Sequence, residues 1–226
     1  GAGLAGLHLP SLQHKLATWD HPFAHIFFTT DLQIAAYGAY KNNDGALIIL
    51  GTGFSAQAQV SNIIIPVGGF GFPINAMASG SWFGLEAVKA VLLDADGIGD
   101  QTELTKIVLA EQTIQQLAEK MLKATPGEFA LLAPLVLILA ESGDEVCLKL
   151  RAAACAFVER VCLHLLNTGV PQVTLVGGVA PHLLPYLNES LKTKVTFKGD
   201  AAQLGAWFFV QKEYFALHKC RGKNHV

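Results

Sequence analysis

The sequence predicts an α/β protein in which helices cover a mixed β-sheet. Short apolar runs, rich in β-branched residues and bounded by glycine or polar turns, are typical of buried strands. Longer stretches with apolar residues at helical spacing follow four of these runs. The order of three strands, several helices and then strand, helix, strand, helix favours a mixed sheet flanked by helices.

The composition indicates a globular chain with a large core. Of the 226 residues, 51% are hydrophobic and 15% are charged, which argues against disorder. The formal net charge of -2 provides no basic field for nucleic acid. The most apolar run, residues 129–140, is shorter than the ~20 residues of a membrane span and contains Pro134. Because no signal peptide is visible, we expect a cytoplasmic protein that binds neither membranes nor nucleic acid.

The first 43 residues alternate between strand and helix signals. Gly1–Gly6 indicates a strand end or turn, and Pro10–Thr18 a short helix that begins at proline. The segment His25–Thr29 is rich in β-formers and predicts a buried strand. Helical spacing resumes from Leu32 to Tyr40.

From residue 44 the chain predicts an antiparallel meander and then mostly helices. The expected strands of the meander are Ala46–Leu50, Ser55–Ser61 and Ile63–Val67. The expected helices that follow are Ser79–Asp94, Thr102–Leu122, Phe129–Ala140 and Asp144–Thr168. The expected ending is strand Val173–Val176, helix His182–Leu191, strand Lys194–Phe197 and helix Ala201–Leu217.

A carboxylate at the junction of a strand and a helix is the first candidate for chemistry. Asp31 directly follows the first buried strand. There it can accept the proton of a hydroxyl nucleophile as a general base. Aspartate is also a favoured helix N-cap, so a purely structural role is the alternative.

Two glycine turns are candidates for binding phosphate or nucleotide. Gly51-Thr52-Gly53 lies between two strands, where N–H groups and the threonine hydroxyl can point at an anion. An ordinary hairpin turn is the alternative. Gly177-Gly178 follows a strand and precedes a helix, so a flat ligand or phosphate can approach bare backbone there. A close strand–helix crossing is the alternative at this second turn.

The segment Gly1–Gly6 also matches the G-x-G-x-x-G fingerprint of dinucleotide-binding domains, with Asp31 as the later acid. The strand that should precede this fingerprint is absent from these residues. The antiparallel meander also interrupts the βαβ run that such a domain needs. An NAD-binding domain is therefore a minor alternative.

The order of the motifs resembles one family. Asp31 after a strand, the Gly51–Gly53 turn between strands, GGFGFP, SGSWFGLEAV, the glycine pair and DAAQLGA follow one another along the chain. Together they are similar to the BadF/BadG/BcrA/BcrD ATPase family, and within it to N-acetylglucosamine and glucosamine kinases. The resemblance implies a ribonuclease H-like, actin-like ATPase fold with two domains. Residues 1–43 would be the remainder of an N-terminal domain, and residues 44–226 a C-terminal domain with a helical insertion at about 95–168.

The same resemblance implies ATP-dependent phosphorylation of an amino sugar, with Mg²⁺ accompanying ATP. Asp31 would be the catalytic base and would also contact the sugar. The other implied ligands are Gly51, Thr52 and Gly53 for the phosphates, Gly177 and Gly178 for adenosine, and Gly69, Gly71, Asn75 and Ser79 for the sugar. No side chain is implied as a metal ligand. The identity of the amino sugar, the hydroxyl that reacts and the formation of a homodimer stay open.

Two departures from the family pattern carry expectations of their own. Ala76 and Met77 stand where the family usually has an acidic pair, which removes a charge-assisted hydrogen bond worth ~1.5–3 kcal/mol. A catalytically degenerate sugar- or nucleotide-binding protein is therefore the alternative function. No DGGGT-like first phosphate loop is found in these residues. We expect a chain without that loop to be inactive, because phosphoryl transfer depends on positioning and charge stabilisation.

Three cysteines lie in one expected helix. The spacing of Cys147, Cys155 and Cys162 matches no CxxC metal pattern, so we expect free buried thiols. The alternative is an ATPase activator of a radical dehydratase, another branch of the family. Such a protein would hold an iron–sulfur cluster through thiolates near a subunit interface.

Overall fold

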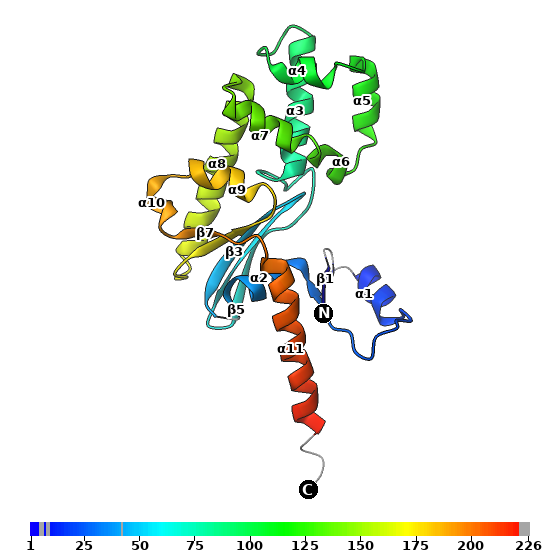
Figure 1. Ribbon diagram of the computed structural model, residues 1–226, viewed down its shortest axis with the longest axis vertical. Helices are drawn as coiled ribbons and strands as arrows, with labels where there is room; N and C mark the ends of the chain where they lie inside the picture. Colours follow the sequence, from blue (N-terminus) through cyan, green and yellow to red (C-terminus); the bar gives the residue numbers. More distant parts are fainter. Residues whose placement is uncertain (5–6, 8–9, 42, 222–226) are drawn as a thin grey trace.

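A five-stranded mixed sheet forms the centre of the computed structural model, and a two-stranded sheet lies beside it (Figure 1). The structure describes all residues except 5–6, 8–9, 42 and 222–226. The strands are β1 (Ala2–Leu4), β2 (Phe28–Thr30), β3 (Gly45–Leu50), β4 (Phe54–Val60), β5 (Ile63–Gly68), β6 (Val173–Val176) and β7 (Val195–Phe197). The helices are α1 (Pro10–Ala17), α2 (Asp31–Tyr40), α3 (Gly80–Ala95), α4 (Glu103–Val108), α5 (Ile114–Leu122), α6 (Pro126–Ala130), α7 (Ala133–Glu141), α8 (Glu145–Leu166), α9 (Ala180–Leu183), α10 (Glu189–Lys192) and α11 (Ala201–Arg221).

The large sheet has the strand order β5-β4-β3-β6-β7. The pairs β3–β4 and β4–β5 are antiparallel, which confirms the predicted meander. The pairs β3–β6 and β6–β7 are parallel, so the α/β class with a mixed sheet is confirmed. In the small sheet, β1 and β2 are parallel.

Side chains of β3 alternate between two cores, because successive residues of a strand point to opposite faces. Ile48 and Leu50 are fully buried in the larger core, together with residues of α3, α7 and α8. Leu47 points to the opposite face and packs in a smaller core with Ala35 and Tyr40 of α2. The central sheet therefore lies between two layers of helices.

Two stretches that we expected as single helices are each divided. Residues 102–122 form α4 and α5, and residues 129–140 lie in α6 and α7. Thr113 and Thr125 begin α5 and α6 with capping boxes. In each, the threonine oxygen accepts the backbone N–H of the residue three positions later, and the side chain of that residue accepts the backbone N–H of the threonine. Pro134 in the first turn of α7 favours a new helix start. The expectation of continuous helices was wrong because local capping outweighs the apolar spacing.

The single helix expected over residues 182–191 is also wrong. This segment contains the end of α9, a 3-10 turn at Leu184–Tyr186 and most of α10. Pro185 has no N–H to donate within a continuous helix. The side chain of Asn188 accepts the N–H of Ser190 at 3.0 Å and so begins α10.

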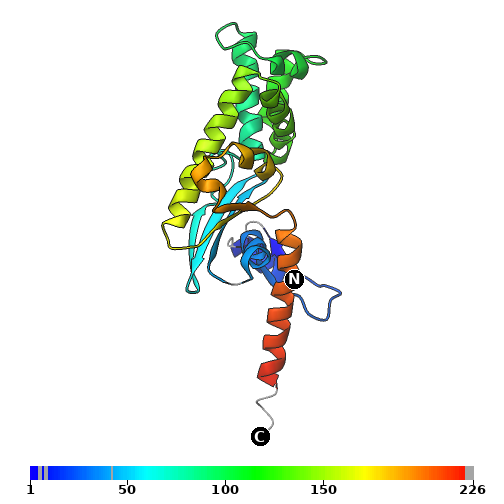
Figure 2. The ribbon, with the colours of Figure 1, turned by 60° about the vertical axis from the view of Figure 1, so that its left-hand side comes forward.

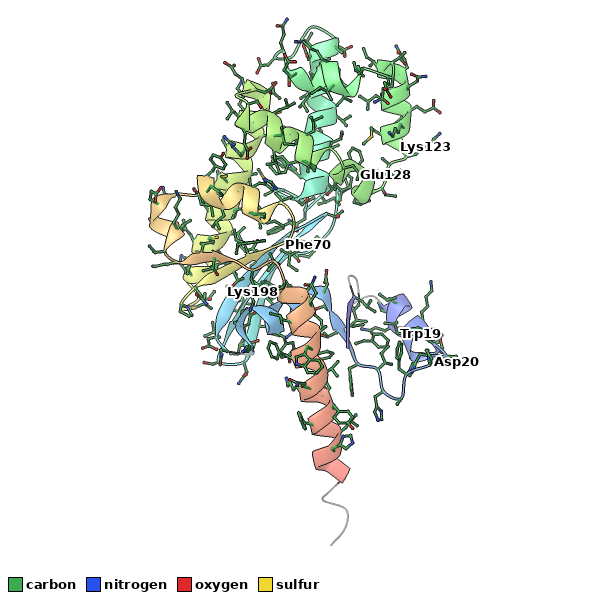
Figure 3. The ribbon with its side chains drawn as sticks, viewed as in Figure 1. Trp19, Asp20, Phe70, Lys123, Glu128 and Lys198 are labelled. Carbon is green, nitrogen blue, oxygen red and sulfur yellow. The ribbon has the colours of Figure 1, made fainter. Side chains whose placement is uncertain are left out.

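The last helix packs along the first segment of the chain. A Cβ atom on Gly205 of α11 would lie 1.7 Å from the carbonyl oxygen of Ile34 in α2, and one on Gly38 would lie 1.7 Å from that of Ala201. The ammonium of Lys198, before α11, donates to the Gly38 carbonyl at 2.7 Å (Figure 3). Figures 1 and 2 agree that the C-terminal part of α11 extends away from the large sheet. The domain boundary after residue 43 stays a prediction.

Candidate functional site

Two of the predicted motifs meet where the parallel strands β3 and β6 end. Ile49 pairs with Val176 in the sheet, so both strands end at the same edge. The N–H of Val179 donates to the carbonyl of Leu50 at 3.0 Å. A Cβ on Gly177, whose φ is +98°, would lie 2.4 Å from the same oxygen. The Gly177-Gly178 turn therefore lies against the start of the Gly51–Gly53 turn, at a distance that excludes a side chain.

The Gly51–Gly53 turn is held from one side by the start of α3. Its first two carbonyls accept the N–H groups of Gly80 at 2.7 Å and Ser81 at 3.1 Å. The N–H of Gly51 donates to the carbonyl of Gly53 at 3.1 Å, so this donor is used inside the turn. Within the described residues, the N–H groups of Thr52 and Gly53 and the Thr52 hydroxyl have no hydrogen-bond partner. These three donors are therefore free to bind an anion.

Three glycines of the two turns face space that a ligand can occupy. A Cβ on Gly51, Gly53 or Gly178 would meet no atom within 4 Å. A pocket of about 420 Å³ opens beside them. Its lining residues come from the two turns and from the helices α3, α6, α7 and α9: Gly51, Thr52, Gly80, Ala130, Ala133, Pro134, Leu137, Gly178, Val179 and His182.

Sequence reasoning identified the glycine side of this pocket and missed its opposite wall. Ala130 and Ala133 come from α6 and α7, in a stretch that the sequence marks only as an apolar helix. His182 was also missed, although it lies soon after a strand and a glycine pair. That order could have identified it, because a first helical turn after such a pair commonly faces the ligand site.

Asp31 is not the N-cap of α2. Thr30 is the N-cap, and its hydroxyl oxygen accepts the N–H of Gln33 at 3.1 Å. Asp31 is the first helical residue, and its Oδ1 accepts the N–H of Leu32 at 2.9 Å. The side chain is exposed, and none of the ion pairs among the described residues includes it. Asp31 is therefore not the N-cap, although one of its oxygens accepts an N–H of the first helical turn.

The start of α2, where Asp31 lies, is at the same end of the fold as the end of β3. The connection between α2 and β3 is short, and a Cβ on Gly45 would lie 2.8 Å from the ring of Tyr40. The ten residues of α2 and the six of β3 have similar lengths, about 15 and 20 Å. Leu32 and Ile49 pack in the same core, near the start of α2 and the end of β3. Asp31 is outside the lining of the 420 Å³ pocket.

The segment expected to bind the sugar forms a tight loop between β5 and α3. The N–H of Asn75 donates to the carbonyl of Gly71 at 2.8 Å, and its Oδ1 accepts the N–H of Phe70 at 3.3 Å. Gly69 and Gly71 have φ values of +83° and +87°, a region that favours glycine. The side chain of Asn75 therefore holds the loop closed.

Ser79 connects this loop to the Gly51–Gly53 turn. Its side chain is fully buried and its oxygen accepts the N–H of Trp82 at 3.3 Å, as the N-cap of α3. The first residues of the same helix hold the glycine turn. The methyl group of Ala76 is also buried, with 2% exposure. Between residues 68 and 80 the chain has no carboxylate, so Asp31 is the predicted site residue that brings negative charge.

The fold and these motifs match those of known proteins. The family model of the BadF/BadG/BcrA/BcrD ATPase family matches residues 1–202. The chain belongs to this family. It is 28% identical over 221 residues to the glucosamine kinase GspK of Vibrio cholerae, covering 97% of this chain and 75% of that protein.

Solved structures of other proteins share the fold. A Chromobacterium violaceum protein assigned as an N-acetylglucosamine kinase superposes with a TM-score of 0.80 at 28% identity, over 92% of this chain and 74% of that one. A Porphyromonas gingivalis protein with the same assignment gives 0.64 at 19% identity, over 88% and 67%. The fold class implied by the resemblance is thereby confirmed.

The cysteines of this family member are core residues. Cys147, Cys155 and Cys162 are free and lie buried on α8. Burial raises the pKa of the Cys147 thiol to about 12, that of Cys155 to about 11 and that of Cys162 to about 12. The expectation of free buried thiols is confirmed. A cysteine that binds a cluster as a thiolate needs a lowered pKa, which electropositive and partly exposed surroundings provide.

Two features are absent from the described part of the chain. No helix there is long and apolar enough to cross a bilayer. No group of three or more histidine, cysteine, aspartate or glutamate side chains there could hold a metal ion.

Proposed function

We propose that the protein is an ATP-dependent sugar kinase that phosphorylates a hydroxyl of N-acetylglucosamine or glucosamine. Membership of the ATPase family and the similarity to the two kinases support this class of reaction. The single observation that carries the proposal is the junction of the two glycine turns. There, among the residues that the structure describes, the N–H groups of Thr52 and Gly53 and the Thr52 hydroxyl have no hydrogen-bond partner, and a pocket opens beside Thr52 and Gly178.

In the proposed reaction, the Gly51–Gly53 turn binds phosphate oxygens through its free N–H groups and the Thr52 hydroxyl. The adenosine lies against Gly177-Gly178. The sugar oxygen attacks the γ-phosphorus, a new P–O bond forms, and the bond from phosphorus to the β–γ bridging oxygen breaks to release ADP. Asp31 accepts the proton of the attacking hydroxyl.

We propose that the sugar lies between Asp31 and the loop of residues 68–80. Gly69 and Gly71 would allow a close approach of the backbone, and Asn75 would keep the loop in shape. The buried Ser79 would position the loop rather than touch the sugar, because its oxygen already accepts a hydrogen bond from the start of α3. Domain closure would then exclude water from the reaction.

Mg²⁺ is proposed as the companion of ATP. The oxygen groups of this site suit it, since Mg²⁺ prefers oxygen ligands and is commonly bound by substrate phosphates with one or two carboxylates. The Thr52 hydroxyl is an oxygen group of the turn that is proposed to bind the phosphates. The ion would supply neutralisation of phosphate charge.

The experiment that tests the proposal replaces Asp31 with Asn in the protein expressed from its complete reading frame. We expect kcat to fall by about 10²–10⁴, because a general base is lost, while the Kd for ATP changes little. Asp20→Asn is the matched control, since Asp20 is an exposed carboxylate of the same segment (Figure 3). ADP release and calorimetric binding are measured for both variants. Turnover that survives in Asp31→Asn would exclude Asp31 as the base.

A catalytically degenerate binding protein is the second candidate function. It is favoured by Ala76 and Met77, which leave the sugar loop without a carboxylate. Such a protein would bind ATP or an amino sugar in calorimetry and release no ADP in the presence of both. Turnover of the unmodified protein would exclude it.

We also propose a reducing, cytoplasmic location. The three buried cysteines are free, which suits a compartment that keeps thiols reduced. A homodimer stays a prediction, which light scattering of the purified protein checks.

A further inference from the structure

The pocket beside the two glycine turns has walls of unlike chemistry. One wall is apolar and consists of Ala130, Ala133, Pro134 and Leu137 of α6 and α7. The other wall consists of the backbone after β6 and of the exposed ring of His182. Among the ten lining residues, Thr52 and His182 carry the polar side chains, and none is a carboxylate, an amide, a lysine or an arginine.

Three backbone donors that follow β6 are already used. The N–H of Val179 donates to Leu50, that of Ala180 to Gly177 and that of His182 to Val179, at 3.0, 3.2 and 3.1 Å. These groups cannot donate to the edge of a bound base without breaking the local fold. A ligand would therefore touch this wall mainly through van der Waals contacts and would form few hydrogen bonds to it.

A site distinguishes one base from another through hydrogen bonds to the base edges. The wrong base leaves a polar group of the site without a partner, which costs binding free energy. An aromatic ring, in contrast, stacks on any base, since every base has a π-face. Apolar contacts discriminate only weakly between molecules of similar shape. The side chains that line this pocket favour recognition by stacking over recognition by hydrogen bonds.

We propose that His182 stacks on the base of the donor nucleotide against the apolar wall of α7, so that the site accepts ATP and GTP alike. This inference rests on the proposed kinase function, in which the Gly51–Gly53 turn holds the phosphates. It assigns a base-binding role to a residue outside the motifs named in the sequence. The donor class becomes purine nucleoside triphosphates rather than ATP alone.

The first test compares the two nucleotides. Calorimetric Kd values for ATP and GTP are measured with the protein from its complete reading frame, and kcat/KM is measured for each with the amino sugar. We expect the two nucleotides to differ by less than about 10-fold in either measurement. A preference for ATP of more than about 100-fold would overturn the inference and leave the kinase function standing. Binding of neither nucleotide would overturn the proposed function and this inference together.

The second test addresses His182 directly. We expect His182→Ala to raise the Kd for ATP and for GTP by a similar factor of about 10, and His182→Phe to stay within about 3-fold of the unmodified protein. His164→Ala is the matched control, because His164 is an exposed histidine of α8 outside the pocket. Equal losses in His182→Phe and His182→Ala would show that the ring nitrogens bind the nucleotide, and would overturn the stacking role. No loss in His182→Ala would overturn it as well.

Discussion

Gly177 has two separate reasons to be glycine. Its φ of +98° lies in a region that L-residues with a side chain rarely adopt, and a Cβ there would lie 2.4 Å from the Leu50 carbonyl oxygen. That oxygen already accepts the N–H of Val179. The contact brings the end of β6 against the end of β3, so the geometry of both glycine turns depends on one missing side chain.

Replacement of Gly177 by alanine is expected to destabilise the protein more than replacement of Gly143. Gly143 has a similar φ of +92° but open space around a Cβ, so its alanine variant measures backbone strain alone, roughly 1–2 kcal/mol. Gly177→Ala adds the contact with Leu50, and we expect a further loss of roughly 1–3 kcal/mol with weaker ATP binding. Urea unfolding and calorimetry of both variants measure this. Equal losses of stability would contradict it.

The crossing of α2 and α11 depends on backbone-to-backbone contact between the two helices. Gly38 and Gly205 let the helices approach so closely that a Cβ on either would lie 1.7 Å from a carbonyl oxygen of the partner segment. The ammonium of Lys198 also donates to the Gly38 carbonyl. This crossing connects the C-terminal helix to the helix that begins with Asp31, so it positions the proposed base.

Alanine at position 205 is expected to lower the free energy of unfolding by roughly 1–3 kcal/mol, because α11 must move away from the Ile34 carbonyl. Gly127→Ala in α6 is the matched control. Gly127 is exposed, and the atom nearest to a Cβ there would be the Thr125 hydroxyl oxygen at 3.8 Å, an ordinary van der Waals contact. Alanine there is expected to be neutral or to stabilise by up to about 1 kcal/mol. Thermal unfolding compares the two variants, and equal effects would show that the crossing tolerates a methyl group.

For the whole molecule, three buried thiols make stability depend on alkaline pH. Burial raises the pKa values of Cys147, Cys155 and Cys162 in the folded protein to about 12, 11 and 12, whereas an unfolded cysteine titrates near 8.5. The folded state therefore keeps protons that the unfolded state releases. The stabilisation is complete below about pH 8.5 and is lost as the pH rises towards the folded values.

We expect each thiol to remove about 1.4 kcal/mol of stability for every pH unit above about 8.5. Urea unfolding at pH 8, 9 and 10 measures this loss. A variant with alanine at Cys147, Cys155 and Cys162 should start from a lower stability, because small cavities form, and should lose less of it across this range. The same slope in both proteins would assign the alkaline loss to other groups.

Much of the fold follows from local pattern, and the exceptions have local causes. The meander, the strand before the glycine pair and the helix α8 follow from spacing and turn residues. The breaks before Thr113 and at Pro185 were not expected, because apolar spacing continues across them. A capping box at Thr113 begins a new helix, and the missing N–H of Pro185 interrupts the other one. In the candidate site, the free donors of the Gly51–Gly53 turn were expected from the sequence, and the opposite wall of the pocket was not.

By itself, the sequence determined the types of most elements, the order of the motifs and the likeness to one ATPase family. These properties depend on residue spacing and on the backbone preferences of glycine and proline within a few turns of chain. Only the tertiary structure decided that Gly177 contacts the Leu50 carbonyl, that α3 holds the Gly51–Gly53 turn, and that α7 and His182 form the walls of one pocket. The reason is the parallel pairing of β3 with β6, which joins segments far apart along the chain and leaves no signal in either segment alone.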